Sequence, residues 1–176
     1  MARPLYGQGL LMVQRDVISY VIVFDYEDEE MEYYGLLSRD GDQLRREEER
    51  LRAEMQSQLD SERVIINGVQ VKPVVRAARV EVRGEPRRSS ATFIAEIPWS
   101  PRRGVNVYED FYEPDVAGYD YVVYWSFPAC AAVRSYEMPG EVRLHDNVLE
   151  VRVRRGTRLD GYESIAFELP GGCLVP

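Results

Sequence analysis

The chain has 176 residues, of which 45% are hydrophobic and 30% charged, as in ordered globular proteins and unlike disordered or fibrous chains. Its formal net charge of −8 repels phosphate backbones, which argues against nucleic-acid binding. The apolar run Val17–Phe24, flanked by Asp16 and Asp25, is much shorter than the roughly 20 residues that a membrane helix needs. We therefore expect a cytoplasmic protein with no membrane association.

The composition also bears on the source of the protein. Lys72 is the sole lysine among 22 basic residues, and asparagine and cysteine are scarce. Abundant Glu and Arg with few thermolabile residues favour a thermophilic, archaeal-like source. A GC-rich genome would produce the same arginine bias.

The N-terminal part predicts hairpins. Leu10–Val13 is followed by a polar turn and then by Val17–Tyr26, whose nearly continuous hydrophobicity predicts a strand buried on both faces. An acidic stretch at residues 27–30 leads into Met31–Leu37, which alternates weakly. We expect a second hairpin here, with an acidic tip.

One long helix is predicted near residues 42–59. Gln43–Leu59 contains no Pro, Gly or β-branched residue, and either Asp40 or Asp42 is placed to cap it. Oppositely charged residues recur at i,i+4, in the pairs Arg45–Glu49, Glu48–Arg52 and Arg50–Glu54. The apolar seam is narrow and comprises Leu44, Leu51, Met55 and Leu59. This pattern predicts a surface helix that docks one seam on the chain's own sheet, with self-association as the alternative.

Most of the remaining chain predicts strands. Asn67-Gly68 between two apolar runs is a strong hairpin signal. In Tyr119–Phe127, large aromatic and apolar residues occupy alternate positions, which predicts a half-buried strand. We expect a mainly β fold (α+β at most): an antiparallel β-sandwich or partly open barrel of about ten strands. A single domain over 1–176 is expected, with a possible division into 1–60 and 61–170 and a loose tail at 171–176.

The residues that usually carry catalysis are scarce. His145, the sole histidine, falls in a predicted hairpin turn where side chains are mostly solvated. Cys130 and Cys173 are read as two inert thiols, or as one disulfide that ties down the C-terminus. The acidic run from Asp25 to Glu32 offers oxygen ligands but lacks EF-hand spacing, so a solvated hairpin is expected. No metal or cofactor is predicted.

The candidate surface residues lie in one region of the sequence. Trp99, Tyr108, Glu109 and Asp110 combine acidic and aromatic side chains, as a sugar-binding groove would. Nearby, Arg102-Arg103 is one of three arginine pairs that would form an anion site if the turns met. Ordinary solvated loops have the same composition, so these residues are candidates and nothing more specific.

A stretch near the C-terminus resembles a known family. Met138-Pro139-Gly140, Leu144–Arg155 and Phe167-Glu168-Leu169-Pro170 resemble parts of the α-crystallin domain of small heat-shock proteins. The resemblance covers residues 138–170, with a shorter spacing after Pro-Gly and no strand after the Leu-Pro element. It implies a holdase-like chaperone that assembles through edge strands.

Three functions follow as expectations. The first is a non-catalytic binding or structural module that contacts a protein partner or a second copy of itself, because ordinary catalytic constellations need residues that are nearly absent here. The alternative is a carbohydrate-active enzyme or sugar-binding module that uses acidic and aromatic loop residues. The second alternative is a chaperone-like assembly protein.

Overall fold

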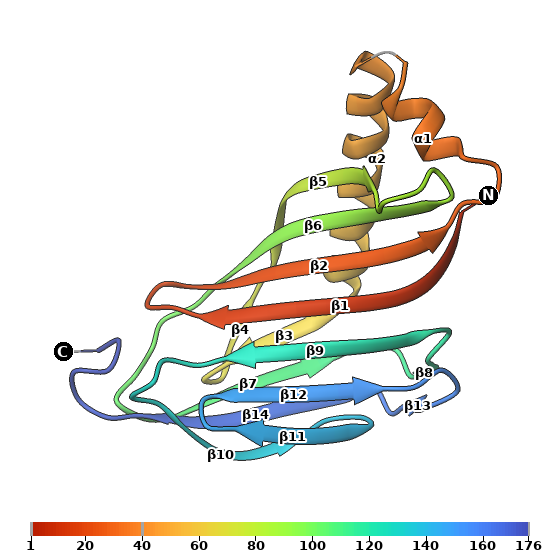
Figure 1. Ribbon diagram of the computed structural model, residues 1–176. Coiled ribbons are helices and arrows are strands. Elements are labelled where there is room, and N and C mark those ends of the chain that lie inside the picture. Colours follow the sequence, from red (N-terminus) through yellow and green to blue (C-terminus); the bar gives the residue numbers. More distant parts are fainter. Residues whose placement is uncertain (1, 40, 176) are drawn as a thin grey trace.

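A computed structural model describes residues 2–39 and 41–175. The protein is mainly β, with 54% of its residues in strands, two open sheets of seven and five strands and one long helix. Figure 1 shows the seven-stranded sheet in front, with the long helix behind one part of it and the five-stranded sheet behind the other. The expected mainly β fold with one long helix is confirmed.

The seven-stranded sheet is antiparallel except where the neighbouring strands β1 and β9 run parallel. In order its strands are β11 (Glu141–His145), β12 (Val148–Val153), β9 (Asp120–Ser126), β1 (Arg3–Val13), β2 (Val17–Glu27), β6 (Arg88–Pro98) and β5 (Val74–Val82). The aromatic strand predicted at 119–127 is therefore β9, beside the N-terminal strand.

The five-stranded sheet is antiparallel throughout. In order its strands are β10 (Ala132–Glu137), β14 (Tyr162–Leu169), β7 (Gly104–Phe111), β3 (Arg63–Ile66) and β4 (Val69–Val71). A separate two-stranded ribbon pairs β8 (Asp115–Val116) with β13 (Arg158–Leu159). The predicted Asn67-Gly68 turn joins β3 to β4, with φ of 54° and 80° at the two residues, and is confirmed.

The predicted strand at Met31–Leu37 is wrong, because Glu32–Leu37 forms a short helix, α1. Met31 adopts a left-handed conformation (φ 54°), and the buried carboxylate of Asp28 accepts hydrogen bonds from the backbone N–H groups of Glu32 and Tyr33. Asp28 thus satisfies donors at the start of the helix. The acidic run is a helix start here, not a hairpin tip.

The long helix α2 spans Gly41–Ser61 and confirms the prediction. Leu51, Met55 and Leu59 are buried against β5 and β6. Of the expected i,i+4 pairs, Arg50–Glu54 forms, whereas the Glu48 carboxylate accepts a hydrogen bond from the Val80 N–H at 3.2 Å and pairs with Arg79. Glu48 therefore fastens the helix to β5. Asp40 lies outside the described residues.

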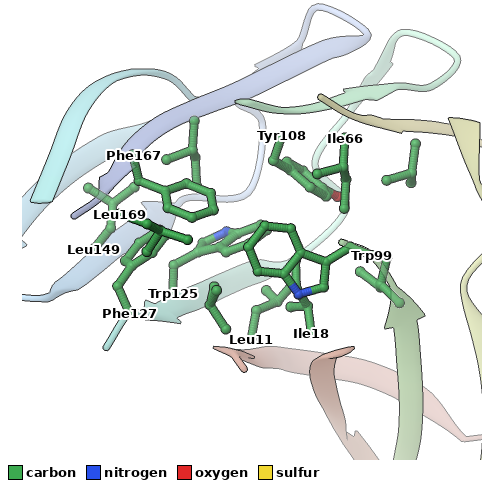
Figure 2. Close-up of a cluster of buried hydrophobic side chains, with 14 of the residues drawn as sticks. Leu11, Ile18, Ile66, Trp99, Tyr108, Trp125, Phe127, Leu149, Phe167 and Leu169 are labelled. Atoms are coloured by element: carbon green, nitrogen blue, oxygen red, sulfur yellow. The ribbon is translucent and has the colours of Figure 1, made fainter. Parts of the chain in front are cut away.

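The space between the two sheets holds the main core. Phe127, Phe167 and Trp99 pack together, with ring centroids 4.9 Å apart for Phe127–Phe167 and 5.8 Å for Trp99–Phe167. Figure 2 shows these rings with Trp125, Tyr108 and aliphatic side chains from both sheets. This end of the molecule is closed and apolar.

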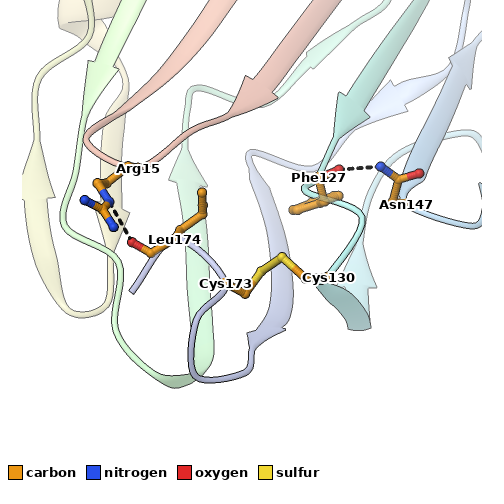
Figure 3. The surroundings of a disulfide bond; sticks show 6 residues. All are labelled: Arg15, Phe127, Cys130, Asn147, Cys173 and Leu174. Carbon is orange, nitrogen blue, oxygen red and sulfur yellow. Dashed lines mark hydrogen bonds between the residues drawn. A yellow bond between two sulfur atoms is a disulfide. The ribbon is translucent and has the colours of Figure 1, made fainter. Parts of the chain in front are cut away.

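A disulfide closes the same end. Cys130 and Cys173 are bridged, which selects the second of the two expected readings (Figure 3). Cys173 is buried, and Arg15 Nε donates to the Leu174 carbonyl at 3.0 Å. The tail expected to be loose at 171–176 is therefore anchored at 173 and 174, and Pro176 lies outside the described residues.

The other face of the seven-stranded sheet has no cover in the described part of the chain (Figure 1). Tyr124, Leu10, Val21 and Ile94 are register partners that form an apolar row across β9, β1, β2 and β6 on this face. Ile94 is 44% exposed. The expectation that Val17–Tyr26 is buried on both faces is wrong, because α2 and the second sheet cover one face only. Among the described residues, no helix is long and apolar enough to cross a membrane.

Candidate functional site

A cleft opens where the seven-stranded sheet, the five-stranded sheet and the C-terminal half of α2 meet. It encloses about 310 Å³ and is bounded by Met55 and Leu59 of the helix and by residues of both sheets. Ligand pockets usually measure about 300–1,000 Å³, so the cleft is large enough for a small molecule. We refer to it as the acidic cleft.

Two glycines of β1 form its floor. Gly7 and Gly9 follow the inward alternation of Leu11 and Val13, so larger side chains there would project into the cleft. A Cβ atom on Gly9 would lie 3.2 Å from Tyr20 Cε2, and one on Gly7 would lie 3.1 Å from Tyr119 Cε2. The glycines therefore leave room that aromatic rings partly cover.

Three carboxyl groups line the acidic cleft: Glu62, Asp110 and Glu163. Asp110 of β7 and Glu163 of β14 are directly opposed in the antiparallel pair, so their Cβ atoms lie about 4.5–5.5 Å apart on one face. Glu62 precedes Val64, the partner of Asp110 on β3, by two residues and thus shares that face. The strand register therefore gathers acids from three separate segments.

Burial dominates the titration of this trio. Burial, with a smaller contribution from neighbouring carboxylates, raises the pKa of Glu62 to about 8 and that of Glu163 to about 7. Burial also raises the pKa of Asp110 to about 6, against an opposing hydrogen bond with Tyr108. Groups with such values exchange protons near neutral pH and can serve as general acids or bases.

Five tyrosines line the same space: Tyr20, Tyr108, Tyr112, Tyr119 and Tyr121. The Tyr112 hydroxyl donates to Glu163 Oε1 at 3.1 Å. Tyr108 packs edge-on against Trp125, with centroids 4.7 Å apart. Burial raises the pKa of all five, so they stay neutral and act as hydrogen-bonding rings.

The acidic cleft is not electrostatically balanced. Among its described lining residues none is Lys, Arg or His, and in the described part of the chain none of the three carboxyl groups forms an ion pair. Asp110 Oδ1 is buried and has no hydrogen-bond partner there. A buried acceptor without a donor is destabilising and calls for an explanation.

The structure separates the acidic and aromatic candidates. Tyr108 and Asp110 lie in the acidic cleft, whereas Glu109, between them on β7, faces the other way and accepts a hydrogen bond from Tyr162 at 3.0 Å. Trp99 is 6% exposed and belongs to the core, where its Nε1 donates to the Gln14 carbonyl at 2.8 Å.

The basic and metal candidates lie elsewhere. Arg102 and Arg103 are exposed in the β6–β7 loop, where Arg102 Nε donates to the Val105 carbonyl at 2.8 Å. His145 is the last residue of β11, at the sheet edge, and its Nε2 atom lies 3.5 Å from Glu150 Oε2. Within residues 2–39 and 41–175, no cluster of three His, Cys, Asp or Glu side chains is arranged to hold a metal ion.

Sequence reasoning missed Glu62, Glu163 and four of the tyrosines. A signal was present in the alternation: Glu163 shares the inward face of β14 with Ile165, Phe167 and Leu169, which are all buried. An acid at an inward position of an otherwise apolar strand is a candidate functional residue.

Comparisons with known proteins identify no family. No protein-family model matches the chain, and no curated protein does. A solved structure of yeast LTA4 hydrolase in complex with bestatin is similar over 96% of this chain and 29% of that one, with 10% identity and a TM-score of 0.31. A likeness at this level supports no inference about fold or activity.

Proposed function

We propose that the protein binds a small polar organic molecule in the acidic cleft. The observation that carries the proposal is a cavity of about 310 Å³ with a glycine floor, three half-buried carboxyl groups and five tyrosines. A concave site with apolar walls and a few convergent polar groups is the usual form of a ligand pocket. Perturbed acids in such a cleft add support.

The stability cost of the arrangement also supports the proposal. Burying a carboxyl group without a cationic partner destabilises a fold, and apolar side chains at these positions would pack better. Strand β14 carries such side chains a few residues from Glu163, at Ile165 and Phe167. A bound ligand that pairs with the acids would offset the cost.

Blocking the floor tests this proposal whatever the ligand is. Gly9→Val places a branched side chain in the acidic cleft, whereas Leu10→Val alters the uncovered face of the same strand. Ligands found by thermal-shift screening of amines, polyols and sugars should bind at least tenfold more weakly to Gly9→Val than to Leu10→Val. Equal binding by the two folded variants would contradict a site in the cleft.

If the site is catalytic, the reaction we propose is hydrolysis of a glycoside. The direct opposition of Asp110 and Glu163 favours it, because retaining glycosidases hold two carboxyl groups about 5–5.5 Å apart. Turnover of nitrophenyl glycosides that disappears in both Asp110→Asn and Glu163→Gln would support it. Activity that survives both substitutions would exclude this pair.

A second candidate function is protein contact through the uncovered sheet face. The apolar row of Tyr124, Leu10, Val21 and Ile94 favours association with a second copy. Sedimentation velocity should then detect a dimer that Ile94→Arg dissociates. A monomer at all concentrations would contradict self-association through this row.

A further inference from the structure

We infer that the acidic cleft selects an organic cation, a small amine whose ammonium N–H groups donate to Asp110, Glu163 and Glu62, over a neutral sugar. This inference rests on the proposed function and adds the chemical class of the ligand. It follows from the charge, the acceptors and the rings of the cleft.

The charge of the cleft is the first reason to expect a cationic ligand. The cleft brings three carboxyl groups together, and its described lining supplies no cationic side chain. Arg63, which begins β3 beside Glu62, stacks over the Phe111 ring at 4.5 Å and is exposed. An ammonium ion would supply the missing positive charge in a space where opposite charges attract more strongly than in water.

The excess of hydrogen-bond acceptors is the second reason to expect a cationic ligand. Asp110 Oδ1 is buried without a donor, and the carboxyl groups of Glu62 and Glu163, once ionised, bring further acceptors. A primary ammonium group carries three donors and no acceptor, which matches this excess. A sugar hydroxyl brings one donor and also needs donors in return, which the described lining offers mainly from its tyrosine hydroxyls and the amides of Gln8 and Gln58.

The aromatic rings of the cleft are the third reason to expect a cationic ligand. Tyr20 and Tyr121 come from the seven-stranded sheet, Tyr108 comes from the five-stranded sheet and Tyr112 directly follows β7, so aromatic groups lie on both sides of the acids. Aromatic faces attract cations, most strongly where water is excluded. Aliphatic carbons of the amine would pack on Met55, Leu59 and Trp125.

The test compares ligands that differ in charge and little else. Calorimetry at pH 8 would titrate the protein with 1,4-diaminobutane and 1,4-butanediol, and with choline and its neutral isostere 3,3-dimethylbutan-1-ol. Maltose and cellobiose test the sugar class. We expect the diamine to bind at least tenfold more tightly than the diol and than either sugar, and choline, which lacks N–H donors, to bind between diamine and diol.

Matched variants locate the binding. Asp110→Asn and Glu163→Gln should each weaken diamine binding at least tenfold, whereas Glu109→Gln, on the outward face of β7, should leave it unchanged. Circular dichroism confirms that each variant is folded. Binding should also weaken at least tenfold at pH 5, because the three carboxyl groups that face the ligand are then protonated, while the five tyrosines are neutral at both pH values.

The outcomes separate this inference from the proposed function. Diol or sugar binding as tight as diamine binding, abolished by Gly9→Val, would overturn the cation inference and leave the cleft as a ligand site. Diamine binding unchanged in Asp110→Asn and Glu163→Gln would also overturn it. No binding of any probe at millimolar concentration would overturn the inference, and Gly9→Val without effect on any ligand would overturn the proposed site.

Discussion

The two ends of the space behind the seven-stranded sheet are built from the same strands and differ in chemistry. Along β14, Phe167 and Leu169 fill the closed end, whereas Glu163 faces the acidic cleft. Along β1, Leu11 packs at the closed end, whereas Gly7 and Gly9 leave space at the other. One end is packed and cross-linked, and the other keeps polar groups in a cavity. Stability and binding thus occupy different segments of each strand.

The largest effect on the free energy of unfolding should come from a substitution at the packed end. Phe167→Ala removes a ring that is 1% exposed and contacts both Trp99 and Phe127. We expect a loss of about 3–5 kcal/mol in the free energy of unfolding, as for other buried Phe→Ala changes. Urea denaturation measures it. A loss below about 1 kcal/mol would contradict the packing described here.

Removing the disulfide should have the second-largest effect on the free energy of unfolding. Replacing both Cys130 and Cys173 by alanine opens a loop with a sequence separation of 43 residues. The entropy of loop closure predicts a loss of about 2–4 kcal/mol. Unfolding with and without a reducing agent should differ in the native protein and not in the double variant. Ligand binding should be unchanged, because the bridge lies at the closed end.

A substitution in the acidic cleft should raise the free energy of unfolding, in contrast to the two changes above. The folded pKa of Glu163 is raised to about 7, from an ordinary value of 4.5. Between these values the folded state binds more protons than the unfolded state, so the stability that Glu163 contributes is complete below about pH 4.5 and is lost as the pH rises through about 7. Glu163→Gln should therefore stabilise the protein by about 1–3 kcal/mol at pH 9 and by little at pH 4.

The control for this substitution is on the neighbouring strand. Glu109→Gln removes an acid on the outward face, next in sequence to Asp110. Chemical denaturation at pH 4 and pH 9 should show changes within about 0.5 kcal/mol, as for most surface substitutions. Equal stabilisation by the two variants would mean that net charge, not burial, sets the effect.

Much of the fold could be predicted from local patterns. The Asn67-Gly68 turn, the alternation of Tyr119–Phe127 and the unbroken helical composition of Gln43–Leu59 each determine structure within a few residues. The segment Met31–Leu37 was mispredicted because its structure depends on the buried Asp28 carboxylate, which accepts from the first helical N–H groups. Weak alternation does not contain that information.

The acidic cleft was only partly predictable, for a physical reason. The local sequence indicates Asp110 and Tyr108 as candidates, but Glu62 and Glu163 lie 48 and 53 residues from Asp110. They meet it through strand register, which depends on long-range pairing. The outward orientation of Glu109 likewise follows from register, since a shift of one residue would exchange it with Asp110.

The most direct test of the acidic cleft is a carboxyl-carbon NMR titration of Glu62, Asp110 and Glu163, with and without 1,4-diaminobutane. We expect midpoints well above the ordinary range for all three groups in the free protein. We also expect the diamine to lower those midpoints, because a bound cation favours the ionised carboxylates. Midpoints near 4 in the free protein, unmoved by the diamine, would show that the three acids are solvated and that the cleft is not a cation site.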